Sequence, residues 1–526
     1  MKAGTEREIS KAAASGGQIK LGGVLSYIQI ALNVIVGLVY TPIMIKLLGK
    51  SEYGLYNTVA STVAMLSILN LGFSSGYIRY YARYREAGDE DSIHKLNGLF
   101  LIIFLVIGAV AFACGMFLTT HLELVFDKGL TGAELDTARV LMLLLTVNLT
   151  VSFPMSVFAS IITAHERFVF LKLIGMIKNV ASPLLTIPLL LMGHGSVAIV
   201  AVTIFVSAAV DTVYVIYVLR VLKQRFVFRD FPQGIFASLF GYTAFIAINI
   251  IIDQINWNVD KTLLGRFKGT AVVAVYSVGA VLQTYYNTFS TSLSGLFSPR
   301  IHAIVNSAEL KSAERDAKLS DLFIRVGRIQ FVILMLILSG FVFFGRDFIR
   351  FWAGEGYEES YAVALLLMAP VTVPLTQNLG IEIQRAKNLH RFRSLVYLGM
   401  AVVNLTLSIF LAKRYGAWGA AFGTALALVI ANGFIMNVYY YRRCGIDIPR
   451  FWANIGRLAI ALIPPAAAGI AIMLFVKVGS VWGLIALIAA YSALYAVSMW
   501  AIGLNGEEKR LLLTPINRIR NRGAKE

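Results

Sequence analysis

Residues 96–120 read LNGLFLIIFLVIGAVAFACGMFLTT, a stretch of 25 residues without one charged side chain. About 20 apolar residues are enough for a helix to cross the hydrocarbon core of a bilayer, so this stretch predicts a transmembrane helix. Comparable stretches follow one another along the 526 residues, of which 58% are hydrophobic and 14% charged. Soluble domains carry about 25% charged residues. The composition therefore argues against a soluble enzyme and indicates an all-α polytopic membrane protein.

Apolar stretches of this length predict fourteen transmembrane helices. The first seven are expected near residues 22–47, 54–82, 96–120, 138–165, 168–192, 196–222 and 235–264. The second seven are expected near residues 270–299, 324–349, 360–386, 390–413, 415–441, 454–476 and 480–504. The loops between them are short, so no extramembrane domain is expected and any activity must lie within the bilayer.

The basic residues indicate the orientation. With the N-terminus in the cytoplasm, 33 of the 47 lysines and arginines fall in cytoplasmic segments and 12 in outer loops. Cytoplasmic loops of membrane proteins carry such an excess, so both termini are expected in the cytoplasm, in a bacterial inner membrane. The same rule explains the net charge of +18 without a nucleic-acid partner. The two cysteines, Cys114 and Cys444, suit neither a metal site nor a disulfide framework, and no cofactor is expected.

Short matches at one offset predict an internal repeat. FSSGYIRYYA (73–82) is similar to SGLFSPRIHA (294–303), which places Arg79 and Arg300 221 residues apart. The same offset pairs Asp211 with Asn432 and the HG dipeptide at 194–195 with YG at 415–416, while LLG recurs at 47–49 and 263–265. We therefore predict two six-helix bundles around a central cavity, followed by two C-terminal helices. The expected segments are a tail (1–21), an N-lobe (22–230), a C-lobe (231–445), the last two helices (446–504) and a basic tail (505–526).

Three segments carry a family resemblance. KLLGKSEYGLYNTVAST (46–62) followed by LNLGFSSGYIRYYA (69–82), INWNVDKTLLGRFKGTAVVAVYS (255–277) and KRYGAWGAAFGTALA (413–427) resemble segments of Wzx-type polysaccharide flippases. These belong to the multidrug/oligosaccharidyl-lipid/polysaccharide (MOP) exporter superfamily. The resemblance implies a transporter that flips undecaprenyl-diphosphate-linked oligosaccharide repeat units to the outer leaflet by alternating access. The units would serve O-antigen, capsule, exopolysaccharide or teichuronic-type assembly.

The resemblance also implies partners. These are the undecaprenyl-diphosphate-linked glycan, membrane lipids, and the polymerase and glycosyltransferases of the same pathway, with the transporter itself acting as a monomer. A multidrug or other small-molecule exporter and a lipid-linked peptidoglycan-precursor flippase of the same superfamily remain alternatives. An integral-membrane glycosyltransferase or polymerase is a further one, because the DED at 89–91 is similar to a sugar-nucleotide motif. A solvated charge cluster explains that motif equally simply.

Polar side chains recur at helical spacing in three of the predicted spans. Steps of three, four or seven residues keep side chains on one helix face, and a polar face in hydrocarbon must meet protein or water. The candidates for a sugar-binding cavity wall are Gln29, Asn33, Asn249, Asn256, Gln283 and Asn287. Hydrogen bonding between neighbouring helices is the alternative interpretation.

Charged residues inside spans are costly and often functional. Lys178 and Asp211 lie on consecutive predicted spans and are expected to form a structural ion pair or an ion-coupling site, whereas Asp253 is the stronger coupling candidate. Glu382 and Arg385 are expected to pair with each other, as a gate or as an interface contact.

The repeat-related arginines suit an anionic substrate. Guanidinium groups bind phosphate oxygens through two parallel hydrogen bonds, so Arg79 and Arg300 are candidates to hold the diphosphate at the cytoplasmic mouth. The alternative is that both side chains reach the membrane interface without a ligand.

Overall fold

The computed structural model describes residues 2–126, 129–231 and 235–510, and every regular segment within these ranges is helical. Most of the predicted basic tail, residues 511–526, lies outside the described residues. The described chain forms two compact units: Met1–Ser277 with Tyr397–Thr424, and Val278–Val396 with Ala425–Glu526. We call them the first and the second unit. They do not divide the chain where the predicted lobes do, so the lobe boundaries remain a prediction.

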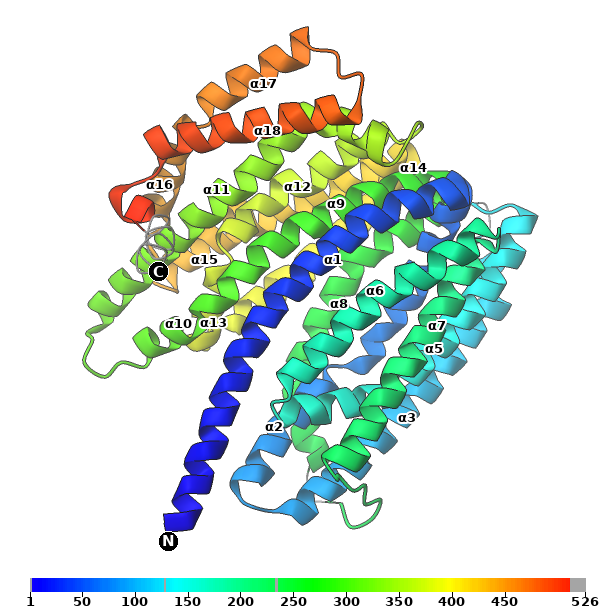
Figure 1. The fold of residues 1–526 in the computed structure, drawn as a ribbon, viewed down its shortest axis with the longest axis vertical. Helices are drawn as coiled ribbons and strands as arrows, with labels where there is room; N and C mark the ends of the chain where they lie inside the picture. Colours follow the sequence, from blue (N-terminus) through cyan, green and yellow to red (C-terminus); the bar gives the residue numbers. More distant parts are fainter. Residues whose placement is uncertain (1, 127–128, 232–234, 511–526) are drawn as a thin grey trace, which may run out of the picture. The chain divides into compact units, whose positions relative to one another are not determined.

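The first unit is built mainly from the N-terminal half (Figure 1). Its helices are α1 (Lys2–Met65), η1 (Leu66–Asn70), α2 (Phe73–Glu86), α3 (Glu90–Thr120), α4 (Leu122–Phe126), α5 (Gly132–Ala164), α6 (Phe168–Leu191), α7 (Gly195–Ile216), η2 (Tyr217–Val221) and α8 (Ile235–Lys268). Two further helices, α9 (Thr270–Ser294) and α14 (His390–Leu428), contribute residues to both units.

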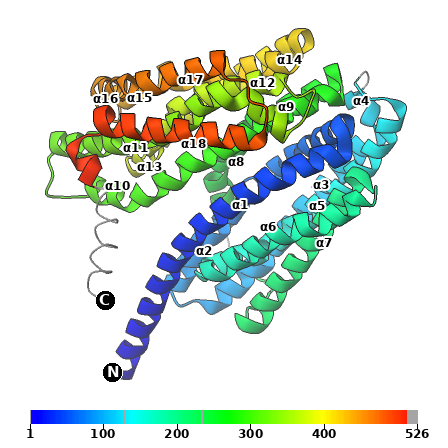
Figure 2. The same ribbon diagram turned by 45° about the horizontal axis from the view of Figure 1, so that its top comes forward.

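The second unit is organised around a helix of 41 residues, α11 (Ser312–Trp352). The other elements are η3 (Gly295–Phe297), α10 (Ser298–Val305), α12 (Glu359–Thr376), α13 (Leu379–Ala386), η4 (Val429–Ile435), α15 (Met436–Arg442), α16 (Ile448–Ile460), α17 (Ile463–Phe475), α18 (Val481–Ser498) and η5 (Met499–Gly503). Figure 2 shows α16 and α18 lying beside α11, which agrees with their packing.

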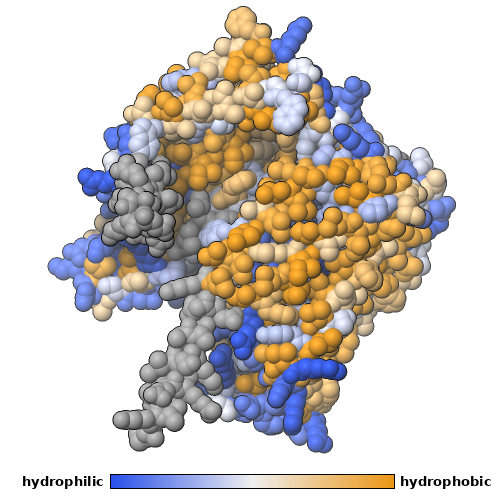
Figure 3. All heavy atoms as spheres, viewed as in Figure 1, coloured by the Kyte–Doolittle hydropathy of each residue, from blue (hydrophilic) through white to orange (hydrophobic). Residues whose placement is uncertain are grey.

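Nine helices among the described residues are long and apolar enough to cross a membrane, or ten if α16 and α17, bent by 47°, form one span. The all-α polytopic class is therefore confirmed. Side chains such as Ile177, Leu184 and Phe205 leave α6 and α7 with an apolar exposed surface. Figure 3 shows this apolar surface over α5, α6 and α7, with hydrophilic residues gathered near the helix ends. Such a distribution is what lipid contact along the spans requires.

Glycines break two of the long helices. α1 contains non-helical Gly49 (φ 75°, ψ 171°), and α14 contains non-helical Gly416 (φ 62°, ψ −138°). A positive φ favours glycine because it has no β-carbon. Each break falls where the sequence predicts a turn between two spans.

The same kind of break recurs at the repeat offset. Gly195 and Gly416 both have φ of 62° and lie 221 residues apart, while Gly49 (φ 75°) and Gly269 (φ 88°) lie 220 apart. Gly265, by contrast, is inside α8. The LLG match at 263–265 was therefore the wrong counterpart of 47–49, because the positive-φ glycine comes four residues later. Backbone turns follow the repeat more closely than the residue matches do.

Packing in the first unit joins α2, α3 and α5 through aromatic side chains. The Tyr77 and Phe100 rings meet edge to face with centroids 5.3 Å apart, and the Tyr77 hydroxyl donates to Oδ1 of Asn97 over 2.6 Å. Both Tyr77 and Asn97 are fully buried. The polar ends of these side chains are thus satisfied inside the apolar core, as buried polar groups require.

Candidate functional site

Asp260 on α8 is a carboxylate buried within the first unit, with 1% of its surface exposed. The Tyr276 hydroxyl donates to its Oδ2 over 2.7 Å, and the Thr424 hydroxyl lies 2.8 Å from the same oxygen. No hydrogen-bond partner among the described residues reaches Oδ1. Lys261 is the cation that acts electrostatically on this carboxylate. The site therefore has one satisfied oxygen and one that is open to a proton or a cation.

Oxygen-bearing side chains continue from Asp260 along α14. The Thr424 hydroxyl also lies 3.1 Å from Oδ1 of Asn404, which accepts a hydrogen bond from Ser408 over 3.3 Å. The Asn404 amide donates to Oδ1 of Asn256 over 3.2 Å. Asn256, a predicted cavity residue, thus belongs to the same network as Asp260. The sequence analysis placed no role on Asp260, although its position seven residues after Asp253 was visible in the polar stripe.

The polar residues of α1 face α6. Asn179 donates a hydrogen bond from its amide to the Asn33 carbonyl oxygen. Gln29 packs so closely on Gly175 that a β-carbon there would lie 2.5 Å from its Nε2. Asn33 is exposed and Gln29 half-buried. The structure therefore gives these two residues contacts with a neighbouring helix, while their role towards a sugar stays a prediction.

The polar residues of α9 are less fully satisfied. Gln283 has 2% of its surface exposed, and its Nε2 has no hydrogen-bond partner among the described residues. The Oδ1 atom of half-buried Asn287 is in the same state. A buried polar atom without a partner costs about 1–3 kcal/mol. These two amides are therefore the members of the predicted cavity wall with hydrogen-bonding capacity to offer a ligand.

The remaining charged candidates lie at separate places. Lys178 and Asp211 are half-buried on the adjacent helices α6 and α7, and Lys178 acts electrostatically on Asp211 without forming a direct ion pair between these two described residues. Asp253 and Asn249 are exposed on α8. The structure does not bring Asp253 into the hydrogen-bonded network of Asp260.

Glu382 and Arg385 on α13 form an ion pair with 2.7 Å between Oε1 and Nη1. The Ser298 hydroxyl of α10 donates to the other carboxylate oxygen of Glu382 over 2.9 Å. Glu382 therefore joins α13 to α10 within the second unit. Whether this contact opens and closes as a gate stays a prediction.

The repeat-related arginines are both exposed, Arg79 on α2 and Arg300 on α10. Arg300 lines a cavity of about 670 Å³ in the second unit, together with basic residues of α11 and α16 and the chain after η5. The structure thus assigns Arg300 to a basic cavity that sequence spacing had not shown, because its other residues come from distant segments.

The DED motif at 89–91 has a structural explanation. Asp89 caps the N-terminus of α3 by accepting from the Ser92 amide over 2.9 Å, and Asp91 pairs with Lys95 over 2.6 Å. Capping carboxylates of this kind stabilise a helix start. These contacts match the charge-cluster interpretation of the motif.

A family model described as "Polysaccharide biosynthesis protein" matches residues 21–301, more than half of the chain. The chain belongs to this family. A curated relative of the polysaccharide biosynthesis family, the "Putative O-antigen transporter" of Shigella flexneri, is 21% identical over 413 residues, which cover 76% of this chain and 92% of the relative.

Solved structures show the fold of this family member. The lipid II flippase MurJ in an inward closed conformation superposes with a TM-score of 0.66 at 15% identity, covering 91% of this chain and 97% of MurJ. An inward-facing multidrug resistance MATE transporter of the MOP superfamily gives a TM-score of 0.60 at 13% identity, covering 82% and 99%. The resemblance to Wzx-type flippases of the MOP superfamily is confirmed, and this polysaccharide biosynthesis protein is a transporter rather than an enzyme.

Proposed function

We propose that this protein translocates an undecaprenyl-diphosphate-linked oligosaccharide from the cytoplasmic to the outer leaflet of a bacterial inner membrane. The observation that carries the proposal is the family match over residues 21–301 together with a relative named as a putative O-antigen transporter. The helical membrane fold supports it, because a lipid-linked sugar needs a polar path through the bilayer. Which surface polymer receives the sugar is left to the host pathway.

The membrane topology that we propose has fourteen spans and two cytoplasmic termini. The breaks at Gly49 and Gly416 support this count, because each divides one long helix into two segments of span length. α8 and α9, of 34 and 25 residues, supply two more helices long enough to cross a bilayer. The distribution of lysine and arginine supports the orientation.

For alternating access we propose the two predicted lobes, residues 22–230 and 231–445, with the polar stripes lining a hydrated path between them. The recurrence of positive-φ glycines at offsets of 220 and 221 supports two pseudo-equivalent halves. The open hydrogen-bonding capacity of Gln283 and Asn287 supports a role in contacting hydroxyl groups. Arg79 and Arg300 are proposed to hold the diphosphate, and the Glu382–Arg385 pair to act at the cytoplasmic gate.

For energy coupling we propose Asp260 as the first candidate, ahead of Asp253 and the Lys178–Asp211 pair. An ionisable group inside a span is expensive unless it works with a partner or a transported ion. Asp260 combines deep burial with one carboxylate oxygen that lacks a partner among the described residues. Binding of a proton or a monovalent cation there would satisfy that oxygen and alter the contact between α8 and α14.

The experiment uses proteoliposomes that hold the purified protein and a fluorescent undecaprenyl-diphosphate oligosaccharide. Quenching by an impermeant reagent reports the amount of substrate in the outer leaflet over time. The proposal expects faster transfer than in protein-free vesicles. Parallel vesicles with a lipid-linked peptidoglycan precursor test the alternative that the MurJ-like fold raises: transfer of that lipid alone would replace the proposed substrate, and cationic drug export would replace both.

A further inference from the structure

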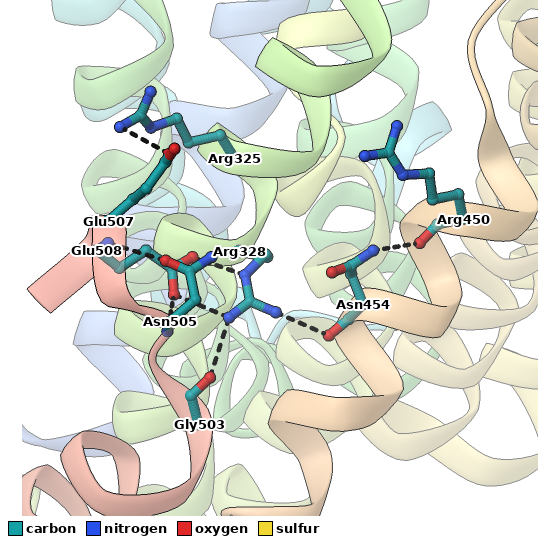
Figure 4. A network of polar contacts seen from close by, with 8 residues as sticks. All are labelled: Arg325, Arg328, Arg450, Asn454, Gly503, Asn505, Glu507 and Glu508. Carbon is teal, nitrogen blue, oxygen red and sulfur yellow. Dashed lines mark hydrogen bonds and ion pairs between the residues drawn. The ribbon is translucent and has the colours of Figure 1, made fainter.

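The basic cavity of the second unit holds an excess of positive charge. Five cationic side chains from four segments of the chain line its volume of about 670 Å³: Arg300, Lys318, Arg325, Arg328 and Arg450. A volume between about 300 and 1,000 Å³ is typical of small-molecule sites. Figure 4 shows Arg328 between the chain after η5 on one side and α16 on the other, with Arg325 and Arg450 to either side.

Three carboxylates line the same cavity, and each is paired with an arginine. Glu508 lies 2.6 Å from Nε of Arg328, and Glu507 lies 3.3 Å from Arg325. Asp321 lies 2.8 Å from Arg450. The cations left over are Arg300 and Lys318. Both are exposed, and within the described ranges neither forms an ion pair or hydrogen bond. The cavity therefore carries two uncompensated positive charges.

Arg328 serves the cavity as a scaffold. Its guanidinium donates to both oxygens of Glu508, to the Gly503 carbonyl over 2.9 Å and to the Asn454 carbonyl over 3.3 Å. These bonds hold the chain after η5 against α11 and α16. With its donors engaged in this way, Arg328 shapes the wall while Arg300 and Lys318 remain available to a ligand.

The cavity lies at one level of the membrane in the proposed topology, on which this inference rests. Its residues surround four predicted cytoplasmic span ends, at residues 299, 324, 454 and 504. The 41 residues of α11 make a helix of about 61 Å, whereas the hydrocarbon core is about 30 Å thick. The first turns of α11, which carry Lys318, therefore extend past the hydrocarbon into the headgroup layer.

We infer that this cavity binds the phosphate headgroup of a lipid in the cytoplasmic leaflet, with Arg300 and Lys318 as its main ligands. A headgroup with two negative charges matches the two unpaired cations. Arginine and lysine both bind phosphate well, arginine through its planar fork and lysine as a point charge. A diphosphate-linked polyprenol and a phospholipid with two phosphates share this chemistry.

The test measures lipid affinity of the purified full-length protein in a neutral detergent, by native mass spectrometry or by thermophoresis. Undecaprenyl diphosphate, cardiolipin and inorganic diphosphate are the probes. A basic residue near an anionic membrane contributes about fivefold in affinity. The double variant Arg300→Ala/Lys318→Ala is therefore expected to bind the lipid about 25-fold more weakly than the wild type.

Two further variants set the direction. Glu507→Gln removes a carboxylate from the cavity, raises its excess charge and is expected to tighten lipid binding about fivefold. Arg220→Ala/Arg229→Ala removes two exposed cations of the first unit and is expected to leave the affinity unchanged. An unchanged affinity in Arg300→Ala/Lys318→Ala, or an equal loss in the control pair, would overturn the inference. Thermal unfolding of every variant excludes a general loss of fold.

The three probes separate the sources of the headgroup. Preference for undecaprenyl diphosphate makes the cavity a substrate entry site, and preference for cardiolipin makes it a site for a resident lipid; both support the inference. Equal binding of inorganic diphosphate, or no binding of any probe, overturns it. Lipid binding without oligosaccharide transfer contradicts the proposed function alone, whereas transfer without lipid binding at the cavity contradicts this inference alone.

Discussion

The hydroxyl of Thr424 lies 2.8 Å from Oδ2 of Asp260, so α14 and α8 meet at a buried carboxylate within the first unit. Tyr276 donates to the same oxygen. A carboxylate held by two hydroxyl groups on one side and open on the other changes its contacts when a proton or cation arrives. This gives the proposed transporter a group through which an ion gradient can act on helix packing.

Neutralising this carboxylate is expected to uncouple transport. Asp260→Asn keeps the size of the side chain but cannot take up a proton or balance a cation. Coupling between two sites is typically worth about 5- to 150-fold, and gradient-driven transfer in proteoliposomes should fall by a factor in this range. Asp136→Asn, the same change at a surface ion pair with Arg139, should behave as wild type. Gradient-stimulated transfer in Asp260→Asn equal to the wild type would remove Asp260 from the coupling role.

Replacing both repeat-related arginines tests the diphosphate proposal. Arg79→Ala/Arg300→Ala removes two guanidinium groups and is expected to slow flipping of the diphosphate-linked substrate by about 10-fold or more, since hydrogen bonds to charged groups are each worth about 1.5–3 kcal/mol. Arg79→Lys/Arg300→Lys keeps the charge and should recover part of the rate. Wild-type rates in the alanine double variant would show that the two arginines only reach the interface.

The contact between α1 and α9 requires a glycine. A β-carbon at Gly54 would overlap the carbonyl oxygen of Thr270, whereas one at Gly23, on the same helix α1, meets nothing within 4 Å. Gly54→Ala is expected to destabilise the protein by about 1–3 kcal/mol, and Gly23→Ala to leave it unchanged or stabilise it by up to about 1 kcal/mol. Thermal unfolding in detergent compares the two. Equal melting temperatures would contradict the close approach.

The contact of Glu508 with Arg328 makes the C-terminal segment sensitive to acid. Burial raises the pKa of Glu508, but hydrogen bonds from Arg328 and from the Asn505 amide outweigh it, so the pKa lies below its ordinary value. A carboxylate with a lowered folded pKa stabilises the fold above its unfolded pKa, and this stability is lost as the pH falls through the folded value. Proteolysis after Asn505 should therefore accelerate at pH values below about 4.

Two glutamates at this place give a matched pair of variants. Glu508→Gln leaves Arg328, 6% exposed, without its counter-ion and is expected to cost about 3–5 kcal/mol. Glu507→Gln breaks an exposed pair at 3.3 Å and should cost less than about 1 kcal/mol. Similar melting temperatures for the two variants, or acid sensitivity that persists in Glu508→Gln, would contradict the role of the buried pair.

The sequence predicted the membrane class and the family because both depend on local signals: apolar runs and short motifs such as 46–62. The repeat was visible at Gly195 and Gly416, where the match includes a glycine whose backbone requires it. It was misread at Gly265, because a residue match alone does not report φ. Spacing also placed Asn256 correctly on a polar face.

The sequence gave no sign of the basic cavity or of the role of Asp260. Arg300, Lys318 and Arg450 come from separate helices, and Glu508 from the chain after the last helix, so only the packing of α11 brings them together. Asp260 was one of several carboxylates in a stripe. What distinguishes it is the contact with Thr424, 164 residues away, which no local pattern contains.

The central claim is that this protein moves a lipid-linked oligosaccharide across the bilayer. The most direct measurement is the rate at which a fluorescent undecaprenyl-diphosphate oligosaccharide reaches the outer leaflet of proteoliposomes, compared with protein-free vesicles. The account predicts transfer that depends on the protein and is slowed by Asp260→Asn. Transfer at the protein-free rate, with the wild-type protein correctly folded and inserted, would contradict it.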